Sequence, residues 1–179
     1  MILGVDKLLK LVKEKKLVEN LCERELKNPE GAGFDLRIGE IYEIYGKGFL
    51  GVEERKTPKI RLVAKYNHKK ITSFIFRPGV YYLMKTIEKV NTPEDISILF
   101  RPRSTLFRSG MMIFTGVASP GYKGELTFGI TNLGNSDIEI DLGARVAHAM
   151  FYEVKGKTNL YRGQWRGGRV TTKKKEKQV

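Results

Sequence analysis

RPRSTLFRSG occupies residues 101–110, and after a short apolar stretch it is followed by SPGYKGELTFGITN at residues 119–132. Arginines, hydroxyl side chains and glycine-containing turns alternate here with segments rich in β-forming residues. Guanidinium groups bind phosphate-like anions well, and glycine turns allow close approach to the backbone. The stretch therefore predicts short strands joined by tight turns, with an anion-binding face.

Short strands continue on both sides of this region. Alternating polar and apolar residues, as in KIRL at 59–62, are typical of half-buried antiparallel strands. We expect a helix over residues 7–16 with Asp6 as its N-cap, and a second helical turn near 21–26. Strands are expected at 35–38, 41–45, 59–64, 71–76, 80–88, 96–100, 111–117, 125–131, 137–141 and 145–153. This pattern predicts a mainly β protein, a compact barrel or jelly-roll-like body with a short N-terminal helix.

The composition favours a single domain with anionic partners. The chain has 179 residues, and 33 Lys and Arg against 20 Asp and Glu give a net charge of +13. Nine of the basic residues and one acidic residue lie within residues 155–179. We expect one domain over residues 1–169, with 154–169 as a flexible closing arm and 170–179 as a disordered basic tail.

Cysteine and histidine are scarce, which excludes some classes of site. Cys22 is the only cysteine, and His68 and His148 are the only histidines. An intrachain disulfide and a zinc site of the His/Cys/Cys type are therefore excluded. The sequence has no signal peptide and no stretch long enough to span a membrane, so we expect a soluble, cytoplasmic protein without a membrane partner.

A single carboxylate stands out in GAGFDLRIG, residues 31–39. Gly31 and Gly33 permit a tight backbone beside Asp35. This carboxylate is a candidate to contact Mg²⁺ through water, because Mg²⁺ keeps much of its hydration in proteins. The alternative is that Asp35 and Arg37 only end a strand.

The segment RPRSTLFRSG supplies candidate phosphate ligands. Arg103 offers a planar fork, and Ser104 and Thr105 add hydroxyl donors. Arg108 follows Ser104 by one helical turn, so a helix here would present both on one side, with its N-terminus toward an anion. An exposed amphipathic turn is the alternative, and the density of donors makes us favour the anion-binding interpretation. His148 is more typical of a structural histidine than of a phosphate ligand.

Two further segments carry aromatic side chains beside glycines. Pro120-Gly121 sets a turn that projects Tyr122, and Gly124 lets the next strand begin close by. Tyr122 could pack on a sugar and leave no room for a 2′-hydroxyl, or it could be a core residue of an ordinary hairpin. Residues 161–169 hold the only tryptophan, and Trp165 in a basic arm suggests a lid that orders on binding and stacks on a base.

Together these segments resemble the dUTPase/dCTP deaminase superfamily, most closely its archaeal deaminase-like monofunctional dUTPases. The likeness rests on the order of MILG, GAGFDLRIG, RPRSTLFRSG, PGYKGELTFGITN, GARVAHAMF and the YRG-x-x-RG ending. It implies a β-clip barrel in a homotrimer with active sites between subunits. It also implies hydrolysis of Mg²⁺-bound dUTP to dUMP and pyrophosphate, which sanitises the nucleotide pool and supplies the precursor of dTMP.

The resemblance assigns a role to individual residues of this chain. Asp35 would hold a water molecule of the metal, Tyr122 would pack on the deoxyribose, and His148 would stand where a phosphate-contacting glutamine is common. With the candidates taken from the residues themselves, the predicted substrate-binding residues are Arg103, Ser104, Thr105, Arg108, Tyr122, Gly124, His148, Tyr161, Arg162, Trp165 and Arg166.

Two positions depart from the pattern of the superfamily. Its deaminases use a glutamate in the strand after the hairpin, where this chain has Gly129. Its hydrolytic members place an aspartate three residues before the hairpin tyrosine, where this chain has Ser119. Serine is a poor base near pH 7, and loss of a positioned base typically costs about 10²–10⁴-fold in rate. Glu125 and Asp35 are the candidates to replace it.

Three classes of function follow, and we rank them in this order. The first is a dUTP diphosphatase with Ser119 at the catalytic position, and dCTP deaminase is its enzymatic alternative. The second is a catalytically impaired homologue that binds a deoxynucleotide and acts as a regulator. The third is a nucleic-acid-binding protein that uses the basic tail, through which we expect only weak contact with nucleic acid.

Overall fold

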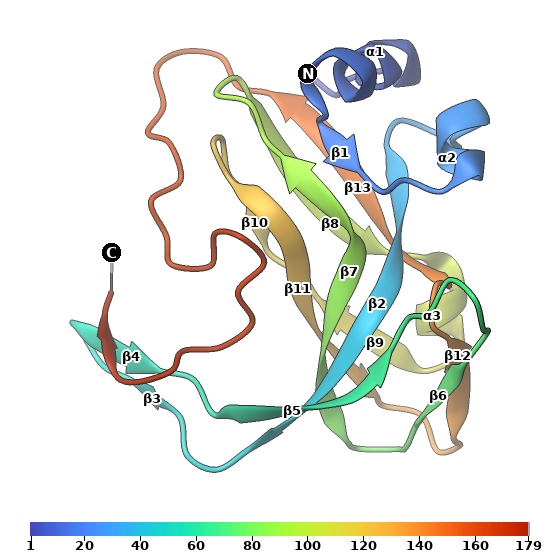
Figure 1. Cartoon of the computed structure of the whole chain (residues 1–179), viewed down its shortest axis with the longest axis vertical. Helices are drawn as coiled ribbons and strands as arrows, with labels where there is room; N and C mark the ends of the chain where they lie inside the picture. Colours follow the sequence, from blue (N-terminus) through green and yellow to red (C-terminus); the bar gives the residue numbers. More distant parts are fainter. Residues whose placement is uncertain (179) are drawn as a thin grey trace.

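Within residues 1–178, which this computed structural model describes, nine strands form one curled antiparallel sheet (Figure 1). The hydrogen-bonded order is β10-β8-β13-β2-β7-β11-β9, and β1 and β5 add to β7 and β2. The strands are β1 (Val18–Glu19), β2 (Phe34–Tyr45), β5 (Lys59–Lys65), β7 (Tyr81–Asn91), β8 (Ile96–Pro102), β9 (Met111–Phe114), β10 (Val117–Ala118), β11 (Lys123–Asn132) and β13 (Arg145–Glu153). The mainly β, barrel-like fold predicted from the sequence is confirmed.

Smaller elements close the ends of this sheet. Strands β6 (Ser73–Phe76) and β12 (Ile138–Asp141) pair with each other, and β3 (Phe49–Leu50), β4 (Glu54–Lys56) and β14 (Glu176–Lys177) form a third sheet. The helices are α1 (Val5–Lys15), α2 (Glu23–Lys27) and α3 (Ser104–Arg108). None of the helices in residues 1–178 is long and apolar enough to cross a membrane.

Strand β7 shows how the sequence positions the functional face of the sheet. Its side chains alternate strictly, so that Tyr82, Met84 and Val90 are buried in the core. Tyr81 and Leu83 point to the opposite face, because successive side chains of a strand lie on opposite sides. That second face is the one across which the C-terminal segment 154–178 runs (Figure 1).

The structure differs from the sequence prediction in several boundaries. The segments expected at 35–38 and 41–45 form one strand, β2, with a register shift between Ile38 and Glu40 instead of a turn. The expected strand 111–117 is divided into β9 and β10. The N-cap of α1 is Gly4, whose backbone is extended, and Asp6 lies inside the first turn without capping it.

The expected disordered tail is a further correction. Residues 170–178 are packed onto the β3–β4 hairpin, and β14 pairs with β4; residue 179 lies outside the described residues. The Thr57 N–H donates to Thr172 Oγ1 at 3.0 Å, and the Thr172 N–H donates back to Thr57 Oγ1 at 2.9 Å. Arg169 forms an ion pair with Glu176. Thr57, Thr172 and Glu176 make the contacts that hold this segment. The many lysines beside them in the sequence led to the prediction of a disordered tail.

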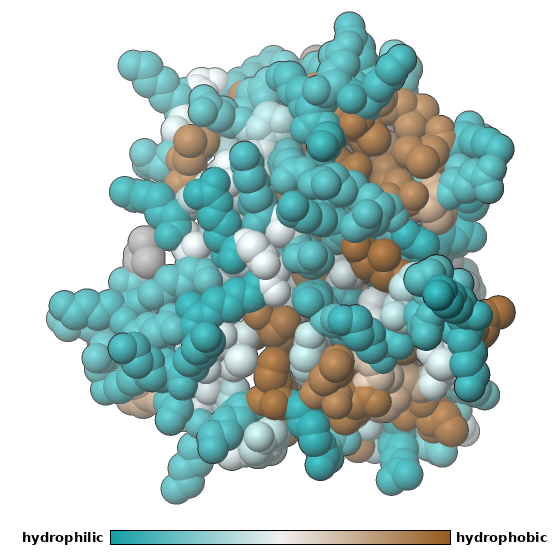
Figure 2. Space-filling model, in the orientation of Figure 1, coloured by the Kyte–Doolittle hydropathy of each residue, from teal (hydrophilic) through white to brown (hydrophobic). Residues whose placement is uncertain are grey.

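Hydrophilic side chains cover most of the face seen in Figure 2, as the large excess of lysine and arginine requires. The hydrophobic side chains exposed on this face gather beside α1 and α2 and near its lower edge (Figure 2). The aromatic side chains of the C-terminal segment are turned inward, onto the sheet, and they form the wall of the site described next.

Candidate functional site

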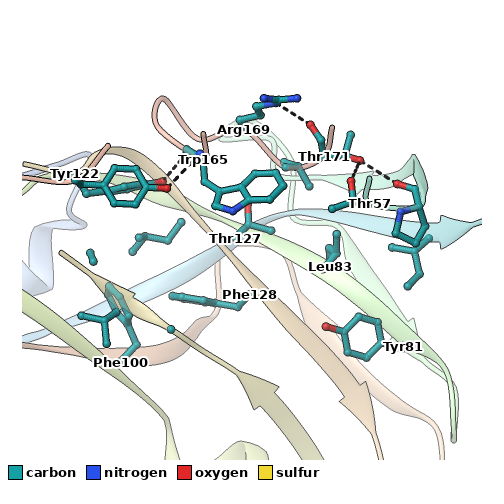
Figure 3. Close-up of a pocket in the computed structure, with 18 residues that line it drawn as sticks. Thr57, Tyr81, Leu83, Phe100, Tyr122, Thr127, Phe128, Trp165, Arg169 and Thr171 are labelled. Atoms are coloured by element: carbon teal, nitrogen blue, oxygen red, sulfur yellow. Dashed lines mark hydrogen bonds between the residues drawn. The ribbon is translucent and has the colours of Figure 1, made fainter. Parts of the chain in front are cut away.

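A pocket of about 480 Å³ lies between the sheet and the C-terminal segment (Figure 3). Leu83 of β7, Phe100 of β8 and Phe128 of β11 contribute apolar side chains to its floor. The C-terminal segment covers it with Tyr161 and Trp165. Other lining residues are Ile44, Thr57, Pro58, Tyr81, Gly116, Val117, Ala118, Tyr122, Leu126, Thr127, Arg169, Val170 and Thr171. We call this cavity the aromatic pocket.

Tyr122 joins the hairpin to the C-terminal segment. Its ring is 7% exposed and meets Tyr161 edge-on, with 5.2 Å between ring centroids. Its hydroxyl lies 2.7 Å from the Glu125 carbonyl oxygen and 3.2 Å from that of Trp165. Burial raises the pKa of Tyr122 to about 12, so the phenol stays protonated and can donate. Tyr122 is therefore a well-packed residue that also forms a wall of the pocket, and its contact with a sugar stays a prediction.

Glycines permit the hairpin and the C-terminal segment to cross in contact. A Cβ at Gly124 would overlap the Gly168 nitrogen and lie 2.8 Å from the Gly167 carbonyl carbon. A Cβ at Gly168 would in turn overlap the Glu125 carboxylate. The Gly167 N–H donates to the Lys123 carbonyl at 2.7 Å. Side chains at these positions would push the segment away from the pocket.

Trp165 is held by cationic side chains. The Arg55 guanidinium carbon lies 4.7 Å from the centre of the indole ring, and that of Arg169 lies at 5.8 Å. The backbone N–H of Trp165 donates to the Tyr161 hydroxyl at 3.2 Å. In contrast, Arg162 and Arg166 are exposed and do not line the pocket. Of the basic residues in the predicted arm, Arg169 is the one that reaches it.

No carboxylate lines the aromatic pocket in the described part of the chain. Ser119 is half-buried beside it, and its carbonyl accepts the Tyr122 N–H at 3.1 Å. Glu125 lines a separate, smaller cavity with Glu40 and Lys85. The Glu125 side chain lies against Gly168, and its role as a substitute for a base at position 119 stays a prediction.

A second polar group of residues lies outside the pocket, around Asp35. Arg145 Nη1 donates to Asp35 Oδ2 at 3.1 Å, and Arg103 pairs with the same oxygen. Arg24 Nη1 lies 3.8 Å from it, and His148 Nδ1 lies 2.9 Å from Asp35 Oδ1. We call these residues, together with Glu25, the arginine cluster. Three chain segments far apart in sequence thus converge on one carboxylate.

Strand pairing and burial explain why this cluster forms. Asp35 on β2 and His148 on β13 are directly paired across the sheet, so their side chains share a face. Asp35 is 4% exposed and Glu25 is 1% exposed, and Glu25 Oε2 accepts the Asp35 N–H at 2.9 Å. Burial lowers the pKa of His148 below its ordinary value, which keeps the imidazole neutral at pH 7.

This arrangement does not fit the expected role of Asp35 as a metal residue. Both oxygens of the carboxylate already have partners, and those partners are the cations of Arg103 and Arg145 and the ring of His148. No group of three or more His, Cys, Asp or Glu side chains suited to a metal ion occurs within residues 1–178. The surroundings of Asp35 therefore disfavour a divalent cation.

The remaining predicted phosphate ligands lie on the surface. Ser104, Thr105 and Arg108 are exposed on the short helix α3. Neither these residues nor Arg103 lines the aromatic pocket. Of the predicted substrate-binding residues, the structure brings Tyr122, Tyr161 and Trp165 together in the pocket. It groups Arg103 and His148 with Asp35 elsewhere.

The sequence interpretation missed several residues of both groups. Arg24 and Glu25 of α2 gave no motif, and they join the arginine cluster only through the fold. Tyr81 and Thr127 line the pocket. One signal was available for Tyr81: a glycine inside a strand, here Gly129, often marks the place where an aromatic from a neighbouring strand lies over the backbone.

The family model for dCTP deaminase-like proteins matches residues 2–154. The chain belongs to this dCTP deaminase-like family, whose match includes the arginine cluster and the hairpin of Tyr122. The crystal structure of 2′-deoxycytidine 5′-triphosphate deaminase from Agrobacterium tumefaciens has a similar fold, with a TM-score of 0.64 and 16% sequence identity. That comparison covers 84% of this chain and 46% of the deaminase chain.

Similar proteins carry the names of two different enzymes. A probable deoxyuridine 5′-triphosphate nucleotidohydrolase of Methanothermobacter thermautotrophicus is 31% identical over 134 residues, which cover 75% of this chain and 85% of that protein. A dCTP deaminase of Pyrobaculum calidifontis is 32% identical over 173 residues, 96% of this chain and 95% of that protein. The relatives of the chain therefore include both nucleotide hydrolases and deaminases.

Proposed function

We propose that the protein binds deoxynucleoside triphosphates, dUTP foremost, and hydrolyses dUTP to dUMP and pyrophosphate. The observation that carries this proposal is the aromatic pocket on the hairpin of Tyr122, whose volume of about 480 Å³ is in the range of small-molecule sites. Relatives named deoxyuridine 5′-triphosphate nucleotidohydrolase support the reaction.

In this proposal the nucleoside occupies the aromatic pocket. The deoxyribose packs against Tyr122, and the base lies on the apolar floor beneath Trp165. The triphosphate extends to Arg103, Ser104, Thr105 and Arg108. Magnesium belongs to the reaction as the counterion that enters with the triphosphate, because the surroundings of Asp35 do not suit a metal.

We further propose that each site is completed by a second copy of the chain, within a homotrimer. The proposed phosphate ligands and the aromatic pocket do not share a cavity in one chain, so a neighbouring subunit would supply one of the two. Exposed apolar side chains on α3, β9 and β10 support such an interface. They are Phe107, Met112, Phe114 and Val117, which are 53%, 39%, 52% and 55% exposed.

A second candidate function is binding of a deoxynucleotide without turnover. Ser119 occupies the position of the family's aspartate, and no carboxylate lines the pocket in the described residues. A regulator or scaffold requires only the pocket and the phosphate ligands. The two candidates share one binding site and differ in whether a bond in the triphosphate is broken.

Product analysis distinguishes these candidates. The purified protein would be incubated with Mg²⁺ and either dUTP or dCTP, beside a Ser119→Asp variant. Pyrophosphate and dUMP from the unmodified protein would establish hydrolysis without an aspartate at 119. Turnover that begins only in Ser119→Asp, with dUTP bound by both proteins, would establish the second candidate.

The expected rise in the hydrolysis rate of Ser119→Asp can be stated, and Ser136→Asp is its control. A positioned carboxylate at 119 should raise hydrolysis by about 10²–10⁴-fold, the usual contribution of a general base. Ser136→Asp adds the same charge in an exposed loop away from the pocket and should leave the rate unchanged. An equal rise in both variants would contradict a specific role for position 119.

Mixing of two variants tests the intersubunit site. Arg108→Ala removes a proposed phosphate ligand, and Trp165→Ala removes the cover of the pocket. If each site combines both groups from different chains, a mixture of unfolded and co-refolded variants should regain part of the dUTP binding that each lacks alone. No regain in mixed assemblies whose mass is about three times the 20.4 kDa chain would contradict shared sites.

A further inference from the structure

The floor of the aromatic pocket contains a buried hydroxyl group without a partner. Thr127 Oγ1 is inaccessible to solvent and makes no hydrogen bond within residues 1–178. Buried polar atoms in native proteins are almost always paired, and an unpaired hydroxyl that lines a pocket suggests a ligand as its partner. Thr127 stands on β11, beside the apolar Leu126 and Phe128.

A second hydroxyl, that of Tyr81, lies over the same strand. A Cβ at Gly129 would overlap this hydroxyl and lie 2.7 Å from Tyr81 Cζ, so no side chain fits at position 129. Gly129 has no positive φ, which means that this glycine is required for space and not for its backbone conformation. The phenol therefore occupies the volume that a side chain at 129 would take.

The ring of Tyr81 is fixed in this place by the sheet. Strand β11 lies between β7 and β9, and Gly129 is paired with Leu83 on one side and with Phe114 on the other. Tyr81 reaches across β11 at Gly129 and contacts Phe114, with ring centroids 5.9 Å apart. Figure 3 shows its hydroxyl directed into the pocket, toward Phe128. Burial raises the pKa of Tyr81, so the hydroxyl keeps its proton.

The two hydroxyls are spaced along one face of one strand. Thr127 and Gly129 are alternate residues of β11, so their outward directions are the same, and their Cα atoms are about 7 Å apart. Around them, on the same face of the sheet, lie apolar side chains that include Ile44 and Leu83. A flat ring laid on this floor can meet one hydroxyl at each of two polar edges.

We propose that Tyr81 and Thr127 determine base specificity by donating hydrogen bonds to the two exocyclic oxygens of a 2,4-dioxopyrimidine, for which the Thr127 hydroxyl, covered in this structure, turns into the pocket about χ1. This inference rests on the proposed function, because it requires the base to lie in the aromatic pocket. Uracil and thymine offer both oxygens. Cytosine offers one, and its amino group leaves one hydroxyl proton without an acceptor in an apolar site, which is costly. The substrate class is thus deoxynucleotides of uracil or thymine type.

Two variants that remove only a hydroxyl test this proposal. The fluorescence of Trp165, the single tryptophan, reports titrations of the unmodified protein, Tyr81→Phe and Thr127→Val with dUTP, dTTP and dCTP. We expect dUTP and dTTP to lose about 3–10-fold in affinity in both variants, the usual effect of one neutral hydrogen bond. Affinity for dCTP should fall in one variant only, because cytosine has one exocyclic oxygen.

The stability of Thr127→Val separates a role in ligand binding from a merely structural role. A hydroxyl that stabilised the fold would lower the stability of the protein when it is removed. Removal of a buried hydroxyl without a partner is neutral or stabilising, so Thr127→Val should unfold at the same or a higher urea concentration than the unmodified protein. Tyr82→Phe is the matched control. Tyr82 is adjacent in sequence but lies on the opposite face of β7, and its loss of a hydroxyl should change no affinity.

The failures of the two proposals are distinguishable. If the unmodified protein binds dUTP and both variants keep its affinity and its ratio to dCTP, the inference on Tyr81 and Thr127 is overturned while the proposed function stands. If the unmodified protein binds none of the three nucleotides, the proposed function fails, and the inference that rests on it falls with it. A loss of dCTP affinity equal to that of dUTP in both variants also overturns the inference.

Discussion

The arginine cluster and the aromatic pocket differ in how their polar atoms are satisfied. In the cluster, a buried carboxylate has each of its oxygens paired with a cation or a ring nitrogen of the same chain. In the pocket, a buried threonine hydroxyl has no partner in the described residues. Folding alone completes the first region, whereas the second, in our proposal, is completed by a ligand. Changes in the cluster should therefore act on stability, and changes in the pocket on binding.

The largest effect is expected from Asp35→Asn. This change keeps the shape of the side chain but removes the negative charge that balances Arg103 and Arg145. Loss of one partner of a buried ion pair typically costs about 3–5 kcal/mol. The arginine side chains are 28% and 30% exposed, and Arg145 also lies near Glu25, so we expect a loss at the lower end of this range. Urea denaturation measures the free energy of unfolding.

Asp137→Asn is the control for Asp35→Asn. Asp137 is exposed, and surface substitutions usually change stability by no more than about 0.5 kcal/mol. If Asp35→Asn were as mild as this control, the cluster would not be a unit that folding completes, and the contrast with the pocket would be lost.

Trp165→Ala should have the next largest effect, and it should act on binding. The indole covers the pocket between Arg55 and Arg169. Stacking of a base on an aromatic side chain contributes about 1–3 kcal/mol, so dUTP affinity should fall by roughly tenfold or more. Calorimetric titration measures this loss, and Trp165→Phe should restore most of it. An unchanged affinity in Trp165→Ala would show that the base lies elsewhere.

The smallest effect is a pH dependence of stability that comes from His148. Burial, and the nearby charge of Arg103, lower its pKa below the ordinary value of 6.5, although Glu25 acts in the opposite direction. As pH falls below about 6.5, the unfolded chain binds a proton at His148 that the folded chain does not. The free energy of unfolding should therefore decrease between pH 7 and pH 5.

His148→Gln removes this titration and keeps a donor toward Asp35. Urea denaturation of both proteins at several pH values measures the difference in slope. The variant should lose less stability than the unmodified protein on acidification, with carboxylate titrations common to both cancelling in the comparison. Equal slopes would mean that the imidazole titrates alike in the folded and unfolded chains.

The fold was largely predictable, because local signals determine most of its strands. Alternation and the Gly, Pro and Asn punctuation indicate the strands of the main sheet. The elements that were not predicted depend on pairing between distant segments. Strands β4 and β14 lie about 120 residues apart in the chain, and no local pattern near either strand indicates the other. The continuous strand β2 was divided by Gly39, which the structure uses for close packing against Ile87 and not for a turn.

The site was predictable as a set of residues but not as a set of contacts. Asp35, Arg103 and His148 were all singled out, and they meet in the fold. The role expected for Asp35 does not fit, since the arginines that pair with it come from segments whose distance the sequence does not reveal. Tyr81 was missed for a similar reason. Its place over Gly129 follows from the register of β7 against β11, which only the structure provides.

The pairing of β14 with β4 has a consequence for how the pocket opens. The C-terminal segment is anchored to the hairpin of Tyr122 through residues 161–168 and to the β3–β4 hairpin near its end. A segment tethered at two points has fewer open conformations than a free tail, so closing it costs less conformational entropy. A ligand would enter as the stretch between these two attachments moves outward from the sheet, while both attachments hold.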